Sequence, residues 1–277
     1  MEVPQVWKLA CTAAEVGCNT FLLEEKETLG GLAAEISKIP AKKRLADFPH
    51  YLEHRAAGLD NLYIFTGTHA TPENIRKFHP NLIVNATGSG PLLPPINGLM
   101  DNIDKEGGNV YSILGMISHI NDFPQDLEGK KIAVIGGGAV GLDVVEFFAA
   151  RKADISIVEM MDQIGRDLDP VTKNDTKCMM KSHDVHQLTK TALLEVKADS
   201  FLVKGSEGEY ELPFDYGFVC LGMRAKGQLY SQLLEAFSDD DVEVINIGDS
   251  QRARRIIDGT MEGRNILYHL TQRGYLD

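Results

Sequence analysis

Three glycines in the pattern G-x-G-x-x-G are the residues whose type and spacing most clearly indicate chemistry. They are Gly136, Gly138 and Gly141, and Ala139 and Val140 occupy the two positions before the last glycine. In such a pattern the first glycine permits a tight turn, the second lets a pyrophosphate approach the backbone, and the third lets a helix pack closely. The glycines therefore predict a turn that binds the phosphates of a dinucleotide.

The segments around these glycines are the ones that such a turn requires. The run Lys131–Ile135 is apolar and β-branched, as in a buried parallel strand, and residues 142–150 have helical periodicity. The N–H groups and the dipole at the start of that helix would hold the phosphates. A second strand, Asp154–Val158, ends at Glu159, where a carboxylate about 20 residues after the turn binds ribose hydroxyls. A glycine-rich turn without a ligand is the alternative, but the order of these elements favours a dinucleotide site.

The acid at the end of the second strand also indicates which nicotinamide nucleotide binds. Glu159 would repel the 2′-phosphate of NADPH, and Met160 and Met161, which follow it, supply no compensating cation. We therefore expect NADH rather than NADPH.

The composition is that of an ordinary globular protein, and it narrows the classes of partner. The chain has 277 residues, of which 43% are hydrophobic and 25% charged. Its formal net charge of −12 argues against nucleic acid as a partner. The sequence has neither an apolar run long enough to span a bilayer nor a signal-peptide pattern. We expect a cytoplasmic protein that does not contact a membrane.

Cysteine and histidine spacing predicts neither a redox disulfide nor a metal site. Cys11, Cys18, Cys178 and Cys220 lack the spacing of a redox pair or of iron–sulfur ligands, so they are expected to be reduced thiols. Electrons would then leave through a flavin or a partner's cluster. Two histidines lie near a predicted helix end without a third ligand at a suitable spacing, which favours capping or solvent-exposed roles: His183 and His186.

A second nucleotide pattern begins near the N-terminus but is incomplete there. Residues 6–16 are predicted to form a helix and residues 20–23 a strand that ends at Glu24. Gly30 and Gly31 follow in a turn. This is the second half of a β–α–β unit without its first strand, and it suits the ribose and diphosphate of a second nucleotide.

The remaining elements alternate between predicted helices and short strands. Helices are predicted at residues 40–57, 72–78, 112–123, 170–182, 228–237 and 254–271. Strands are predicted at residues 62–65, 81–88, 192–203, 210–213, 218–222 and 242–249. Residues 89–98 are predicted to form a proline-rich linker that marks the first domain boundary.

The chain resembles the C-terminal, pyridine nucleotide-disulfide oxidoreductase-like module of a group of flavoproteins. The group comprises 2,4-dienoyl-CoA reductase, 2-enoate reductase and trimethylamine dehydrogenase. Residues 24–31, 86–88, 136–169 and 246–249 carry the resemblance, and residues 158–170, VEMMDQIGRDLDP, are its most specific part. The resemblance implies an α/β fold with two Rossmann-like, doubly wound parallel-sheet domains, the second inserted in the first.

The same resemblance implies domain boundaries. Residues 1–122 and 226–277 would form a flavin-binding domain for FAD or ADP, and residues 123–225 an inserted NAD(H)-binding domain. A barrel domain with FMN and an iron–sulfur cluster precedes this module in the group and is not in the sequence, so a barrel domain or subunit is an expected partner.

The resemblance also implies roles for individual residues. Glu24 would bind the adenosine ribose of FAD or ADP, and Asp249 the ribityl chain. Asp143 would lie near the nicotinamide, although a solvated acid on the helix face fits it equally well. The other implied cofactor-binding positions are small residues in turns at strand ends: Gly30, Gly31, Thr87, Gly88, Gly222 and Gly248. No catalytic residue is assigned.

The flavin domain departs from the group at its first strand. That strand is not in the sequence, and Met1, Val3 and Val6 stand at the three glycine positions of its turn. A Cβ atom at such a position crowds the pyrophosphate and the contact between helix and strand. We therefore expect little FAD in this chain and a gap with exposed strand edges in its sheet. A longer chain or a partner could fill that gap.

Two functions remain open on the sequence alone. The first is an NADH-dependent flavoprotein oxidoreductase module that passes hydride from NADH to a flavin within an enoate or dienoyl-CoA reductase-like enzyme. The second is a non-catalytic domain that binds ADP or NAD and serves as a structural or docking part of a larger complex.

Overall fold

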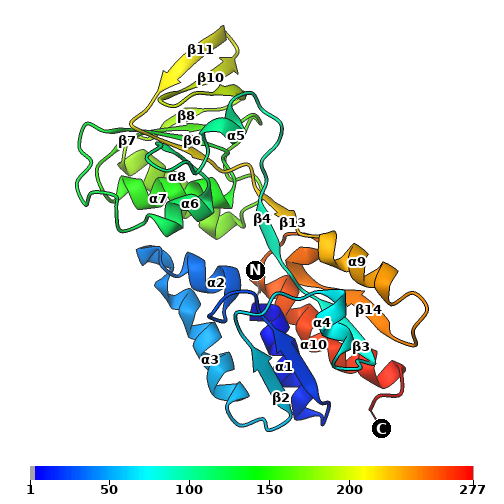
Figure 1. Ribbon diagram of the computed structural model, residues 1–277. Coiled ribbons are helices and arrows are strands. Elements are labelled where there is room, and N and C mark those ends of the chain that lie inside the picture. Colours follow the sequence, from blue (N-terminus) through cyan, green and yellow to red (C-terminus); the bar gives the residue numbers. More distant parts are fainter. Residues whose placement is uncertain (1–3, 277) are drawn as a thin grey trace. The chain divides into compact units, whose positions relative to one another are not determined.

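The computed structural model describes residues 4–276 and divides into two compact units (Figure 1). The inserted unit comprises residues 39–41 and 91–222, and the flanking unit comprises the rest of the chain. Both units combine helices with parallel strands, which confirms the predicted α/β fold class.

The first boundary between the units lies between residues 90 and 91, within the predicted linker 89–98 but earlier than the boundary after residue 122 that the resemblance implied. Residues 91–122 were assigned to the flavin-binding domain, but they belong to the inserted unit. The reason is the two-residue strand β5 (Val110–Tyr111), which pairs with β12 (Tyr216–Val219) of that unit. Residues 223–225 belong to the flanking unit, and the strands at the boundaries near residues 90 and 222, β4 (Ser89–Pro91) and β13 (Met223–Ala225), pair with each other.

The inserted unit is built on one continuous sheet of five parallel strands. Their order is β5–β12–β6–β7–β8. The remaining strands of this sheet are β6 (Lys131–Ile135), β7 (Asp154–Val158) and β8 (His186–Leu188). The apolar runs of β6 and β7 are buried because they lie inside the sheet. Strand β8 was not predicted.

Both faces of this sheet are covered (Figure 1). Helices α6 (Ile113–Ser118) and α7 (Ala139–Ala149) pack on one face, and α8 (Pro170–Ser182) packs on α7. An antiparallel sheet of β9 (Ala192–Val196), β10 (Ser200–Gly205) and β11 (Gly208–Pro213) covers the other face. A short helix, α5 (Leu99–Asn102), precedes them in the chain.

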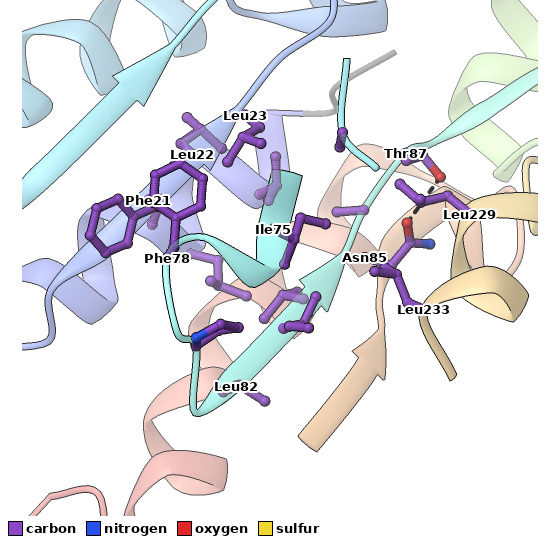
Figure 2. Close-up of a pocket in the computed structure, with 18 of the residues that line it drawn as sticks. Phe21, Leu22, Leu23, Ile75, Phe78, Leu82, Asn85, Thr87, Leu229 and Leu233 are labelled. Carbon is purple, nitrogen blue, oxygen red and sulfur yellow. Dashed lines mark hydrogen bonds between the residues drawn. The ribbon is translucent and has the colours of Figure 1, made fainter. Parts of the chain in front are cut away.

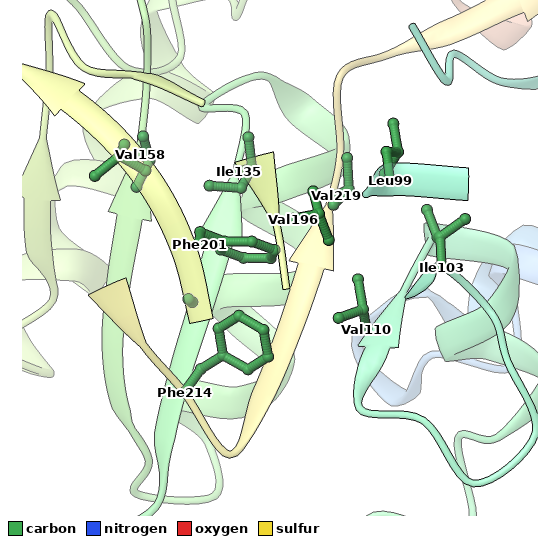
Figure 3. Close-up of a cluster of buried hydrophobic side chains, with 11 residues drawn as sticks. Leu99, Ile103, Val110, Ile135, Val158, Val196, Phe201, Phe214 and Val219 are labelled. Atoms are coloured by element: carbon green, nitrogen blue, oxygen red, sulfur yellow. The ribbon is translucent and has the colours of Figure 1, made fainter. Parts of the chain in front are cut away.

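The two sheets of the inserted unit share a hydrophobic core (Figure 3). Ile135 and Val158 from the parallel sheet contact Val196 and Phe201 from the antiparallel sheet, and none of these side chains is more than 2% exposed. On the helix face, Phe148 packs against Phe218 with ring centroids 4.8 Å apart.

The flanking unit has two separate pairs of parallel strands instead of one sheet. β1 (Thr20–Leu23) pairs with β2 (Leu62–Phe65), and β3 (Leu82–Asn85) pairs with β14 (Glu243–Asn246). Its helices are α1 (Pro4–Glu15), α2 (Gly31–Ile36), α3 (Asp47–Ala56), α4 (Pro72–Arg76), α9 (Gln228–Ala236) and α10 (Ile256–Gln272). The gap expected in the sheet of this domain thus separates β1 from β3.

The helix predicted over residues 40–57 is two helices. A 3₁₀ helix, Pro40–Ala46, is followed by α3. Pro49 has no N–H to donate, so it fits the first turn of a new helix but not the interior of a continuous one. Among residues 4–276, no helix is long and apolar enough to cross a membrane.

Candidate nucleotide-binding sites

The first and third glycines of the central turn are required by the protein's own packing. Gly136 has a φ of +106°, and a Cβ atom there would collide with the carbonyl oxygen of Cys220. A Cβ atom at Gly141 would collide with the carbonyl oxygen of Gly136. These glycines therefore let the turn lie against β12 and let α7 lie against the turn.

The second glycine is different. Gly138 has a φ of −81°, which any residue can adopt, and no atom lies within 4 Å of where its Cβ would be. It is exposed at the N-cap of α7, with Ala139 exposed and Val140 half-buried in the first turn. Packing within the chain gives no reason for glycine here, whereas a ligand close to the backbone would.

Glu159 lies directly after β7 and beside the glycine turn. Its Oε2 accepts a hydrogen bond from the backbone N–H of Gly137 (2.7 Å), and its Oε1 accepts one from the N–H of Met161 (2.8 Å). Within the described part of the chain it forms no ion pair, and Met160 beside it is 68% exposed. The carboxylate is thus fixed at the strand end with its negative charge uncompensated by a cation.

Two further predicted positions of the inserted unit lie near this turn. Burial raises the pKa of the Cys220 thiol, and the charge of Asp143, which is half-buried on α7, raises it further, to about 12. Cys220 is therefore a protonated thiol at neutral pH. Gly222 follows β12 with a φ of +103°, which favours glycine, and its carbonyl accepts a hydrogen bond from the N–H of Leu92.

In the flanking unit, Glu24 is buried at the end of β1 with 3% of its surface exposed. Its Oε1 accepts a hydrogen bond from the N–H of Lys26 (2.8 Å). Gly30 and Gly31 have positive φ values of +109° and +50° and lead into α2. A Cβ atom at Gly30 would lie 2.9 Å from the Cβ of Ala34, so this turn depends on glycine for local packing.

Asp249 lies in the 3₁₀ turn Gly248–Ser250 that follows β14, and it is 8% exposed. Burial raises the pKa of its carboxyl group, which accepts hydrogen bonds from the hydroxyl of Ser89 and the N–H of Arg254, both 3.2 Å long. The N–H of Gly248 donates to Oε2 of Glu262 (2.6 Å). Both oxygens of Asp249 therefore already have partners within the chain.

Thr87 and Gly88 follow β3, as predicted. The hydroxyl of Thr87 donates to the carbonyl of Lys226 at 3.0 Å, and Gly88 has a φ of +72°. Thr87 and Glu24 line a single groove of about 1620 Å³ in the flanking unit, which lies between β1 and β3. The other predicted positions of this unit do not line it.

Sequence reasoning missed a polar network that links β3 to β14. The side chain of Asn85 donates to Oδ1 of Asn246 (2.8 Å), and the hydroxyl of Ser250 donates to the same oxygen (2.7 Å). The two asparagines are partners in the strand register. The available signal was an asparagine at the last position of each strand, which becomes informative only once the pairing is known.

The two histidines considered as capping residues lie apart from these turns. His183 is the C-cap of α8, and Nε2 of His186 in β8 lies 3.4 Å from Oδ1 of Asp154. In the part of the chain that the structure describes, no group of three or more His, Cys, Asp or Glu side chains could hold a metal ion.

Comparison with known proteins identifies the family of this chain. The sequence profile of pyridine nucleotide-disulphide oxidoreductases matches residues 9–248. The chain belongs to this family. The resemblance stated from the sequence is therefore confirmed. The expectation that the family consists of oxidoreductase enzymes is confirmed as well. The family in general binds NAD(P) and FAD.

Relatives of this pyridine nucleotide-disulphide oxidoreductase chain are longer proteins. It is 27% identical to an NADH oxidase of Thermoanaerobacter brockii over 96% of its own length and 40% of that protein. It is 28% identical to a bilirubin reductase of Mediterraneibacter gnavus over 92% of its length and 37% of that protein. A solved structure of 2-naphthoyl-CoA reductase matches 94% of the chain and 37% of that protein, with a TM-score of 0.80 and 21% identity. The chain thus spans about two fifths of the curated relatives' length.

Proposed function

We propose that this chain is the NADH-binding module of a cytoplasmic flavoprotein oxidoreductase that passes hydride from NADH to a flavin. The enzyme would be of the enoate or dienoyl-CoA reductase type. The observation that carries the proposal is Gly138, whose Cβ position is open although no contact with a described residue requires a glycine there. Its place at the N-cap of α7, next to the carboxylate of Glu159, supports a dinucleotide with its pyrophosphate on the turn.

The residues of the inserted unit fit NADH. The exposed N–H groups of the first turn of α7 would hold the pyrophosphate, and Glu159 would accept hydrogen bonds from the adenosine ribose. Bound NADH would supply the hydride and a flavin would accept it, while the protein contributes position and electrostatics. Because Cys220 keeps its proton and lies apart from a second cysteine in the described chain, a flavin rather than a disulfide suits the acceptor.

The residues of the flanking unit fit a flavin only in part. Glu24 and Asp249 stand at strand ends, as the resemblance implies. The glycine positions assigned to Met1 and Val3 lie outside the described residues, and Val6 lies on α1, half-buried against a hydrophobic cluster. A valine there supplies no turn that approaches a diphosphate, so we propose that this chain alone holds FAD weakly. A barrel domain or subunit with its own flavin or cluster would be the partner.

A second candidate function is a non-catalytic nucleotide-binding or docking domain. The separation of β1–β2 from β14–β3 favours it, because the described residues of the flanking unit form no continuous sheet in which to hold a flavin. The two candidates differ in one observable property: only the module reduces an electron acceptor with NADH once a flavin is supplied.

The experiment that tests the proposal is titration of the chain with NADH by calorimetry, in the parent and in Gly138→Val. We expect the parent to bind and Gly138→Val to lose binding while it keeps its thermal unfolding temperature, because only the ligand's space is filled. The matched control is Gly58→Val, since no atom lies within 4 Å of that Cβ position either and Gly58 has no positive φ. Equal NADH affinity in Gly138→Val and Gly58→Val would overturn the proposed site.

Reduction of an added acceptor separates the two functions. With NADH and free FAD or FMN, we expect the parent to reduce ferricyanide faster than the Gly138→Val variant does. NADH binding without reduction of ferricyanide would favour the non-catalytic docking domain.

A further inference from the structure

Helix α3 carries two histidines four residues apart. They are His50 and His54, with Glu53 between them, in the sequence HYLEH. Residues four apart on an α-helix lie one above the other on the same face, with their Cβ atoms about 5–6 Å apart. Two imidazole rings at that separation can reach one ion, since a zinc–nitrogen bond is about 2.0–2.1 Å long. The spacing therefore makes this helix a candidate metal site.

The opposite face of α3 is held in place by packing. Pro49 and Leu52 are buried, and Leu52 belongs to a hydrophobic cluster with Trp7 of α1. The two helices are in contact along their length (Figure 1). Arg55 reaches across to α1, where its Nη2 lies 2.5 Å from Oε2 of Glu15. The backbone that carries both histidines is therefore fixed as a helix before any ion binds.

Both histidines are exposed and have no partner within the chain. Among residues 4–276, neither His50 nor His54 forms a hydrogen bond or an ion pair through its ring. By contrast, the rings of three other histidines lie within 3.4 Å of a carboxylate oxygen: His69, His186 and His269. The ring nitrogens of the pair on α3 are thus available to a ligand from solvent.

Glu53 adds a negative charge to this exposed surface. It lies three residues after His50, and in the described chain its carboxylate forms no ion pair. The cation of Arg55 is already paired with Glu15. The chain as a whole has a formal net charge of −12. Electrostatic attraction therefore favours a cation beside the two imidazoles.

We propose that His50 and His54 bind a divalent transition-metal ion that prefers nitrogen ligands, such as Cu²⁺, Ni²⁺ or Zn²⁺. Imidazole suits these ions, whereas Mg²⁺ and Ca²⁺ prefer oxygen ligands. One nitrogen from each ring binds the ion and water completes its coordination. Glu53 contributes charge next to the ligands. Of the three ions, Cu²⁺ binds most tightly.

The same surroundings distinguish binding from catalysis. The pattern His-x-x-Glu-His also occurs in a class of metallopeptidases, in which the two histidines bind zinc. Catalytic zinc sites have three protein ligands and an open position. In the part of the chain that the structure describes, no third His, Cys, Asp or Glu side chain joins His50 and His54. The pair therefore binds a metal ion without supplying a catalytic centre.

The structure changes the expectation drawn from histidine spacing. The sequence predicted no metal site, since His183 and His186 have no third ligand at a suitable spacing. In the structure His183 is the C-cap of α8 and His186 lies in β8, so these two share no helix face. His50 and His54 share one, and both are exposed on it.

The metal site is separate from the nucleotide sites. No residue of α3 lines the groove between β1 and β3 that Figure 2 shows. The helix belongs to the flanking unit, whereas Gly138 belongs to the inserted unit. Metal binding and NADH binding are therefore tested independently, and Gly138→Val should bind metal ions as the parent does.

Calorimetric titration of the metal-free 277-residue chain with Zn²⁺ tests the proposal. We expect the dissociation constant to rise at least about tenfold in His50→Gln and in His54→Gln, because the loss of even an outer-shell partner costs about 10–100-fold. Both variants should keep the parent's unfolding temperature without metal, since the side chains are exposed. The control is His183→Gln, which should bind Zn²⁺ as the parent does. An equal loss in His183→Gln, or no loss in either α3 variant, would overturn the proposal.

The neighbouring carboxylate and the choice of ion test which atoms bind. Glu53→Gln should weaken Zn²⁺ binding less than His54→Gln does, because it removes a charge and no ligand. Cu²⁺ should bind more tightly than Zn²⁺, and Mg²⁺ should give only heat of dilution. A loss in Glu53→Gln as large as in His54→Gln, or Mg²⁺ binding with the affinity of Zn²⁺, would show that carboxylates hold the ion and would overturn the assignment.

The NMR signals of the imidazole rings locate the ion directly. Zn²⁺ should shift the ring signals of His50 and His54 and should raise the unfolding temperature of the parent, because it binds the folded helix and not the unfolded chain. Both histidine variants should lack this rise in temperature. Shifts confined to other histidines would place the ion elsewhere and contradict the proposal.

Discussion

Both units of this molecule contain a helix, a strand and an acid in the same order, and in the described residues only the inserted unit also has a parallel strand directly ahead of the helix. In the inserted unit β6, α7 and β7 precede Glu159, and the five parallel strands form one sheet. In the flanking unit α1 and β1 precede Glu24, and the parallel strands form two pairs. The difference shows that β1 forms and ends at Glu24 although, in the described sheets, only one of its edges is paired with a strand.

The side chains of the strands are also buried to different extents in the two units. Ile155 and Ile157 of β7 are 1% and 0% exposed, whereas Phe21 of β1 is 40% exposed and Phe65 of β2 is 39% exposed. In the inserted unit one core cluster spans the two sheets, and buried rings such as Phe148 pack on the helix face, while the flanking unit has clusters around Trp7, Leu9 and Ile83. In the described flanking unit, the apolar side chains thus pack around strand pairs that do not join into one sheet.

The largest expected effect compares the same residue type in the two units. Ile157→Ala in β7 should lower the free energy of unfolding by about 2–5 kcal/mol, because a fully buried side chain leaves a cavity. Ile64→Ala in β2 should cost less than about 1 kcal/mol, because Ile64 is already 37% exposed. Denaturant unfolding of both variants measures this. Similar costs would mean that the two sheets are equally well packed.

An intermediate effect concerns the choice of nucleotide at the complete site. Glu159→Gln should bring the affinities for NADH and NADPH closer together, since removal of one like charge near a 2′-phosphate is worth roughly 1–3 kcal/mol. The amide keeps an acceptor for the N–H of Gly137. Calorimetric titration with both nucleotides measures the ratio. An unchanged ratio, or a parent that prefers NADPH, would contradict the role of Glu159.

The smallest expected effect is a pH dependence of opposite sign in the two units. Burial raises the pKa of Asp249 above its ordinary value of 3.8. The stability of the parent relative to Asp249→Asn should therefore be greatest below pH 3.8 and should decline as the pH rises through the raised pKa.

The opposite trend is expected for Asp215 in the inserted unit. The hydrogen bond from the side chain of Lys130, and after it the one from the N–H of Lys131, lowers the pKa of Asp215. Relative to Asp215→Asn, the parent should be most stable above pH 3.8 and should lose this advantage as the pH falls through the lowered pKa. Denaturant unfolding between pH 3 and 7 measures both trends, and trends of the same sign would contradict these environments.

Local patterns in the sequence predicted most of the elements, including the glycine turn. The helix Pro170–Ser182 was predicted with its observed bounds, and in the structure Asp169 caps it and Pro170 is its first residue. The features that the sequence did not predict depend on pairing between segments that are far apart in the sequence. β5 has only two residues and becomes a strand because it pairs with β12, which moves the domain boundary. The pairing of Asn85 with Asn246 and the lining of the groove also join segments far apart in the sequence.

The most direct test of the account is the cofactor content of the purified 277-residue chain, measured by visible absorbance and followed by titration with NADH. We expect little or no FAD, because a flavin without the backbone amides of a glycine turn loses charge-assisted bonds worth roughly 1.5–3 kcal/mol each. We also expect the same sample to bind NADH at the turn around Gly138. Stoichiometric FAD in the chain as given, or no binding of NADH, would contradict the division into one complete and one incomplete nucleotide site.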